Sequence, residues 1–342
     1  MKVNYLLIVL LLVTGNSFGQ KASRFKISNK FHVEGDGSWD YLSIDEATKY
    51  LYISHGTQVN VLDVTSGKFI GIIPDTKGVH GIALVSNLNK GFISNGRDSS
   101  VTVFDTRDLK VIEKIRISGK NPDAIIYDPF SQKIFTFNGR SANATVIDPK
   151  SNKEIGTIHF EGKPEAAVSD ENGKIYVNIE DKSLISVIDA VNMKVLHSWP
   201  LAPGTEPSGL AFDKKTQRLF SVCDNKLMLV VDAQNGKVIT TLLIGERVDG
   251  AAFDPEKKLI YSSNGEGTLT VIAEESANSY KVIETLPTQV GARTIALDYK
   301  THKIYLPTAE YGPAPEPTKE NPRPRPTIKP GTFTILEIEP IE

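Results

Sequence analysis

A short pattern that recurs about every 42 residues is the feature that most constrains the fold. An aliphatic or aromatic residue followed by Asp appears at spacings of 42, 43, 41 and 43 residues, with the aspartates at Asp63, Asp105, Asp148, Asp189 and Asp232. Each Asp precedes a turn cluster, such as Thr65-Ser66-Gly67-Lys68, where its carboxylate can accept backbone N–H bonds. A period of this length indicates many copies of one small unit.

Each unit contains four strand-like segments. Seven copies of an Ile-Ala-Leu type segment, such as Ile82-Ala83-Leu84, are each followed by an aliphatic-aromatic segment. The strand that enters the Asp turn comes next, and a segment such as Val111 to Ile115 closes the unit. A lone sheet of this size cannot bury both faces, and no long helical apolar stripe follows residue 20. The pattern predicts an all-β, seven-bladed β-propeller of four-stranded blades.

The two ends of the chain are expected to share the last blade. The seventh repeat contains strand-like segments at Thr294 to Asp298, Lys303 to Pro307 and Thr332 to Glu337, but no fourth one. Phe25 to Phe31, which precedes the first repeat, resembles an outer strand. We expect this N-terminal strand to complete the last blade and close the ring, because closure removes a free sheet edge. Residues 20–342 would then form one propeller domain.

Residues 1–19 have the features of a signal peptide. A basic residue stands at position 2, Tyr5 to Val13 is apolar, and small residues occupy positions 17 and 19. This pattern predicts cleavage before Gln20 and a periplasmic or secreted product. The apolar run is shorter than the roughly 20 residues that span a bilayer, so no membrane span is expected. Cys223 is the only cysteine, which excludes an intrachain disulfide.

The second segment of each unit carries a family resemblance. Leu51-Tyr52-Ile53-Ser54-His55 and Gly91-Phe92-Ile93-Ser94-Asn95 resemble the YVTN-type propeller repeat. Together with Pro207-Ser208-Gly209-Leu210-Ala211-Phe212-Asp213 and the signal peptide, they make residues 25 to 340 similar to the YncE-like exported propellers. The resemblance implies the propeller fold, while members of the family are implied to bind varied partners.

Alignment of the repeats places a set of polar residues at one rim of the ring. One equivalent position, just before each innermost strand, holds Asp40, His80, Asp123, Glu165, Ser208, Asp249 and Arg293. Loops on the same face are expected to present Asn95, Asn138, Asn264 and His55. Such an oxygen-rich ring is a candidate ligand site and can hold a hard cation such as Ca²⁺. The alternative is that these are solvated loop residues that each cap their own turn.

A proline-rich insertion interrupts the last blade on this same face. Residues 312–331 contain seven prolines, with Arg323 and Arg325 between them. The composition favours a stiff polyproline II segment. We interpret it as a lid or docking arm over the rim, and the alternatives are a tolerated surface insertion or a ligand for an SH3-type domain.

Absent motifs and the net charge disfavour several classes of function. The chain has no phosphate-binding GxxxxGK[ST] loop, HExxH, CxxC or GxSxG motif. A net charge of -2 disfavours a nucleic-acid partner. The leading hypothesis is an exported, monomeric, non-enzymatic propeller that binds a small molecule or a partner protein at the charged rim.

Two enzymatic or redox alternatives remain. The first is a metal-dependent hydrolase that resembles the propeller lactonases, in which Asp123, Glu165 and Asp249 would act by position. The second is a redox scaffold that resembles the haem d1 propellers, which would need an axial histidine, His80 or His55.

Overall fold

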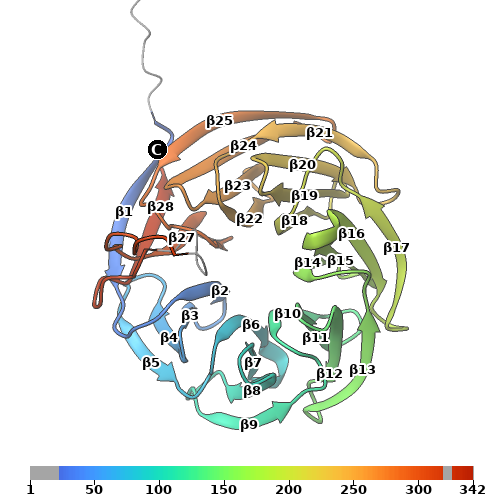
Figure 1. The fold of residues 1–342 in the computed structure, drawn as a ribbon, viewed down its shortest axis with the longest axis vertical. Coiled ribbons are helices and arrows are strands. Elements are labelled where there is room, and N and C mark those ends of the chain that lie inside the picture. The colour runs from blue at the N-terminus through green and yellow to red at the C-terminus, as the bar shows by residue number, and fades with distance from the viewer. Residues whose placement is uncertain (1–22, 319–325, 342) are drawn as a thin grey trace, which may run out of the picture.

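The computed structural model describes residues 23–318 and 326–341, and these form a ring of seven sheets with four antiparallel strands each (Figure 1). The chain passes once around the ring, so blades that follow one another in sequence are neighbours in space. In the first six blades the strands run in chain order from the centre of the ring to its outside. The seven-bladed propeller predicted from the repeat is therefore confirmed.

The strand boundaries follow the repeat. Blade 1 consists of β2 (Trp39–Asp45), β3 (Tyr50–His55), β4 (Gln58–Asp63) and β5 (Phe69–Ile73), and blade 2 of β6 (Val79–Val85), β7 (Lys90–Asn95), β8 (Ser100–Asp105) and β9 (Val111–Arg116). Blade 3 consists of β10 (Pro122–Asp128), β11 (Lys133–Asn138), β12 (Asn143–Asp148) and β13 (Lys153–His159), and blade 4 of β14 (Pro164–Ser169), β15 (Lys174–Ile179), β16 (Leu184–Asp189) and β17 (Lys194–Pro200). Blade 5 consists of β18 (Pro207–Asp213), β19 (Arg218–Cys223), β20 (Leu227–Asp232) and β21 (Val238–Leu243), and blade 6 of β22 (Val248–Asp254), β23 (Leu259–Asn264), β24 (Thr268–Ser276) and β25 (Ser279–Pro287). Blade 7 consists of β26 (Ala296–Asp298), β27 (Lys303–Thr308), β28 (Thr334–Pro340) and β1 (Phe25–His32).

The N-terminal strand closes the ring, as expected. β1 pairs antiparallel with β28, from Phe25 opposite Pro340 to His32 opposite Thr334. The innermost strand of this blade, β26, is two residues shorter than the sequence indicates. The reason is local, because Thr294 adopts a left-handed φ of 59° that a continuous strand does not allow.

A buried carboxylate joins the two ends of the chain beyond the strand ladder. Glu337 of β28 is 0% exposed and accepts hydrogen bonds from Ser28 (2.7 Å), Asn29 (2.8 Å), Lys303 (2.9 Å) and Tyr305 (3.3 Å). Burial raises the pKa of Glu337, but the bonds from Lys303, Ser28 and Asn29 outweigh it and lower the pKa. Two of these donors belong to β1, so the network depends on closure.

The core lies between neighbouring blades. The second strand of each blade has a fully buried aromatic residue at an equivalent position, and these are Tyr52, Phe92, Phe135, Tyr176, Phe220, Tyr261 and Tyr305. Four of them contact a ring of the adjacent blade, as Tyr176 does with Phe212 at a centroid distance of 5.5 Å. The repeated aliphatic-aromatic segment thus encodes the packing of blade against blade.

The repeated Asp residues hold their turns by the hydrogen bonds predicted from the sequence. Asp63 Oδ1 accepts backbone N–H bonds from Thr65 (3.1 Å) and Ser66 (2.8 Å). The same type of turn bond is made by Asp105, Asp148, Asp189 and Asp232.

The only helices among the described residues are two 3₁₀ turns, Ser86–Leu88 and Glu180–Lys182, and neither is long enough or apolar enough to cross a membrane.

Candidate functional site

A β-bulge at the start of the inner strand positions the rim residue in each of blades 1 to 6. In blade 1, Trp39 lies opposite His55 and Leu42 opposite Ile53, so two residues of β2 face one residue of β3. The other bulges lie between Val79 and Ile82, Pro122 and Ile125, Pro164 and Ala167, Pro207 and Leu210, and Val248 and Gly250. A bulge re-aims a side chain. Asp40, His80, Asp123, Glu165, Ser208 and Asp249 all lie within these bulges.

Serines and glycines make the bulges possible. Ser54 Oγ accepts the N–H of Asp40 (2.9 Å), and Ser94 Oγ accepts the N–H of Gly81 (2.8 Å) and donates to the carbonyl of Asp123. Glycine follows the rim residue where the inner strands crowd together. A Cβ added at Gly209, for example, would lie only 2.6 Å from a backbone nitrogen of the next blade. The alternation of polar and small residues was the sequence signal for this geometry.

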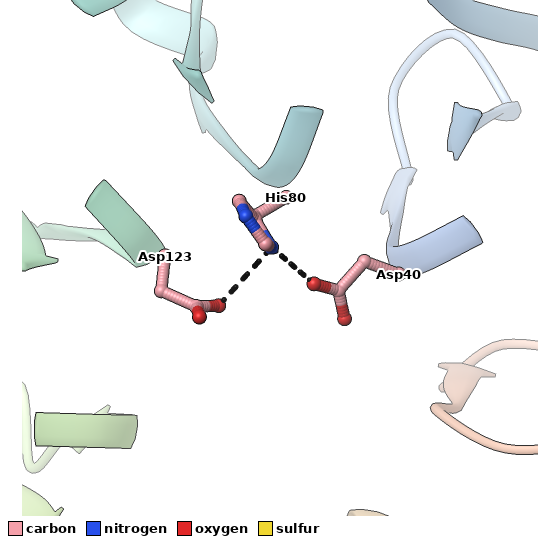
Figure 2. A group of neighbouring side chains, drawn as sticks. All are labelled: Asp40, His80 and Asp123. Carbon is pink, nitrogen blue, oxygen red and sulfur yellow. Dashed lines mark hydrogen bonds and ion pairs between the residues drawn. The ribbon is translucent and has the colours of Figure 1, made fainter. Parts of the chain in front are cut away.

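Asp40, His80 and Asp123 come together at the mouth of the channel. Figure 2 shows both carboxylates directed at one histidine ring from the two neighbouring blades. His80 Nδ1 lies 2.5 Å from Asp40 Oδ2 and 3.5 Å from Asp123 Oδ1. Burial alone lowers the pKa of His80, but the Asp40 hydrogen bond and the charge of Asp123 outweigh it and raise the pKa to about 9. Burial and the charge of Asp40 raise the pKa of Asp123 to about 7.

The remaining two carboxylates of the rim are paired with cations. Glu165 Oε2 lies 3.0 Å from Lys163 Nζ, and Asp249 Oδ2 lies 2.7 Å from a guanidinium nitrogen of Arg293. Ser208 donates to Asp249 Oδ1 at 3.2 Å. Burial and the charge of Asp123 raise the pKa of Glu165 to about 8. Burial raises the pKa of Asp249 to about 6, although Arg293 opposes the shift.

Tyr41 is a channel residue that sequence reasoning missed. The equivalent position in the other blades holds Gly81, Ala124, Ala166, Gly209, Gly250 and Thr294. Tyr41 lines a channel cavity of about 190 Å³ and packs against the core cluster that contains Ala124. Burial and the charges of the four rim carboxylates, Asp123 first, raise the pKa of its hydroxyl well above the usual value. The sequence signal for Tyr41 is that it is the one large residue at a repeat position that otherwise holds small residues.

The three asparagines and His55 do not lie at the rim. Asn95, Asn138 and Asn264 are fully buried, and Asn95 donates to hydroxyl groups of β8 at 3.0 and 2.9 Å. The expectation that they project from loops is wrong, because they end the second strand and point between strands of their own blade. His55 is also buried, with its ring 4.1 Å from that of Phe333, so it does not face the channel.

A cleft of about 510 Å³ opens on the rim face where blades 6, 7 and 1 meet. Its lining includes Trp39, Val290, Tyr311 and Ile328, together with the cations Arg247 and Arg293. The ends of the proline-rich insertion border it, because Tyr311 pairs with Ile328 and the Gly312 N–H donates to the Thr327 carbonyl at 2.8 Å. Arg323 and Arg325 lie outside the described residues, so their role in a lid stays a prediction.

The opposite mouth of the channel holds a larger cavity of about 760 Å³. Aliphatic side chains such as Leu42, Ile126 and Leu210 line its depth, while Lys214 and Glu171 pair with each other at 2.5 Å. Its size alone does not make it the better candidate. The convergent titratable groups with shifted pKa values, which give a site its chemistry, gather at the mouth that holds Asp40, His80 and Asp123.

Comparison with known proteins supports the fold. No family model and no curated protein matches this sequence. Among solved structures, a chain titled "Kuenenia stuttgartiensis Hydrazine Synthase" aligns with a TM-score of 0.70 over 80% of this chain and 94% of that chain. The identity is 16%, so the likeness shows the seven-bladed propeller and nothing of the chemistry.

Proposed function

We propose that this propeller is an exported protein, of the YncE-like kind, that binds a small organic anion in the cleft beside its charged mouth. The observation that carries the proposal is the cleft itself, in which Arg247 and Arg293 stand beside Trp39 and Tyr311. Its volume of about 510 Å³ is typical of ligand sites, which are about 300 to 1,000 Å³ and combine aromatic walls with a few polar groups.

The two arginines have different roles in this proposal. Arg293 is already paired with Asp249, which fixes its guanidinium at the border between the cleft and the channel. Arg247 is exposed and forms no ion pair with any described residue. Asp224 also lines the cleft, so the lining carries two arginines and one carboxylate. Arg247 would supply the positive charge that attracts a carboxylate or a phosphate. Trp39, Tyr311 and Ile328 would contact the apolar body of the ligand.

The Arg247→Gln variant is expected to bind aromatic carboxylates or phosphates about 10- to 100-fold more weakly, because a hydrogen bond to a charged group contributes about 1.5 to 3 kcal/mol. Trp39 and Trp199 are the only tryptophans, so a Trp199→Phe background leaves Trp39 in the cleft as the fluorescent reporter. Titration with benzoate, phenyl phosphate and octanoate gives the affinities.

Arg107→Gln is the matched control, because Arg107 is exposed and paired with Asp105 at the other end of its blade. This variant should bind as the parent does. Equal affinities for the Arg247 and Arg107 variants, or no binding of any of the three anions, would rule out the cleft as an anion site.

Export is the second part of the proposal. Residues 1–19 lie outside the described residues, and cleavage before Gln20 would leave β1, which begins at Phe25, intact for closure. Mass spectrometry of the periplasmic fraction or the medium is expected to find a mature N-terminus at Gln20. An intact Met1 chain that stays in the cytoplasm would contradict export.

Metal-dependent hydrolysis is the second candidate, and the convergence of Asp40, His80 and Asp123 favours it. A bound divalent ion would polarise a carbonyl oxygen of the substrate. Assay of a lactone panel separates the two functions. Turnover that a chelator abolishes supports the hydrolase, whereas anion binding without turnover supports the binding protein.

A further inference from the structure

We propose that Asp40, His80 and Asp123 form a site for a divalent transition-metal ion such as Zn²⁺. The site is built from three neighbouring inner strands, β2, β6 and β10, and its residues converge in Figure 2. One potential ligand atom from each residue lies within 4.8 Å of the other two. The proposal does not depend on the anion cleft, so either can fail alone.

Asp123 is the carboxylate of this cluster that has the weaker contact with His80. Both carboxylates approach the same nitrogen of His80, and Asp40 takes its hydrogen bond at 2.5 Å while Asp123 stays at 3.5 Å. Asp123 is only 8% exposed and accepts no side-chain hydrogen bond from the described residues. A contact of 3.5 Å is too long for a strong hydrogen bond, so Asp123 gains little from His80 alone. An ion shared by the three residues would give Asp123 a closer partner.

A second histidine shows what a purely structural cluster looks like. His302 also has two carboxylates beside it, but Asp254 lies 2.7 Å from Nδ1 and Glu256 lies 3.5 Å from Nε2. Opposite ring nitrogens cannot bind one ion together. In the His80 cluster all potential ligands surround one nitrogen, which is the arrangement that chelation requires.

The scaffold holds the proposed ligands in place. The Asp40 carbonyl accepts a hydrogen bond from Thr294 Oγ1 at 2.8 Å, and Ser94 donates to the Asp123 carbonyl. The far edge of the His80 ring packs on Gly96, where an added Cβ would lie 2.6 Å from Nε2. Outer contacts of this kind orient metal ligands and raise affinity.

The donor set selects the class of ion. Ca²⁺ and Mg²⁺ take oxygen ligands, whereas an imidazole nitrogen with two carboxylates suits Zn²⁺ and other first-row divalent ions. The geometry therefore favours Zn²⁺ over the Ca²⁺ expected from the sequence. Three protein ligands would leave a coordination position open toward the channel, as in catalytic rather than structural zinc sites.

The test is metal titration of the mature protein, prepared without a histidine tag and stripped with a chelator. Calorimetry with Zn²⁺ and visible absorption with Co²⁺ are expected to show one saturable site. The variants His80→Ala and Asp123→Asn should each weaken binding by about 100-fold or more, since even outer-shell changes cost about 10- to 100-fold. His302→Ala should bind as the wild type does.

Three results would overturn the proposal: no saturable Zn²⁺ binding, equal affinity in the His80→Ala and His302→Ala variants, or tighter binding of Ca²⁺ than of Zn²⁺. Circular dichroism checks that each variant is folded. If His80→Ala does not fold, the nearly isosteric Asp123→Asn variant decides the question, and unchanged Zn²⁺ affinity in that variant also overturns the site.

Discussion

Removal of residues 20–34 is expected to lower the melting temperature by roughly 10 °C or more and to make the protein prone to aggregation. The deletion takes away β1, whose Phe25 is buried and packs edge-on against Tyr261 of blade 6 at 5.9 Å. It also takes two of the hydrogen-bond donors of Glu337, Ser28 and Asn29, and leaves that buried carboxylate partly unsatisfied. Differential scanning calorimetry and light scattering measure both effects.

Restoration in trans is the control for this deletion. A synthetic peptide of residues 23–34 should bind to β28 as an edge strand and reverse most of the decrease in melting temperature. The same peptide with Phe25→Ala and Ser28→Ala should restore less, because it lacks the buried ring and one donor to Glu337. A truncated protein that melts like the mature chain would show that closure by β1 contributes little to stability.

The free energy of unfolding is expected to fall as the pH rises from about 4.5 to about 8. The Glu165→Gln variant should lose the share of Glu165 and keep the shares of Asp123 and His80, whose pKa values are also raised. The pKa of Glu165 is raised to about 8 by burial and by the charge of Asp123. In this window the native state therefore holds a proton that the unfolded chain has released. Stability is full below the unfolded pKa and declines by up to about 1.4 kcal/mol per pH unit until the folded pKa is reached.

Asp249 adds to this decline at lower pH, because its pKa is raised to about 6. Urea denaturation at about pH 5 and about pH 8, with a chelator present, measures the slope. Glu171→Gln is the matched control, since Glu171 lies at the opposite mouth, half exposed and paired with Lys214. It should keep the wild-type slope. An equal slope in the Glu165→Gln variant would mean that ionised Glu165 is not destabilising in the native ring.

The architecture could be predicted from the sequence because the repeat is itself the structural unit. Each copy must bury both faces of a small sheet, and only a ring of neighbouring blades does this for all seven copies. The missing outer strand of the last repeat left one segment, Phe25 to Phe31, to complete it, and β1 does so. The turns at Asp63 and its equivalents could be predicted because an Asp turn is a local interaction that needs no tertiary partner.

The charged mouth could be predicted in composition but not in geometry. Alignment placed Asp40, His80 and Asp123 at equivalent positions, yet their convergence on one nitrogen depends on bulges that aim each side chain. A one-residue bulge reverses the side to which a strand residue points. For the same reason, whether Asn95 faced the rim or the blade interior was undetermined until the register was known. The sequence by itself determined the ring and its ionisable residues, because periodicity and turns are local, whereas the tertiary structure decided which of those residues meet, because register and bulges depend on neighbouring blades.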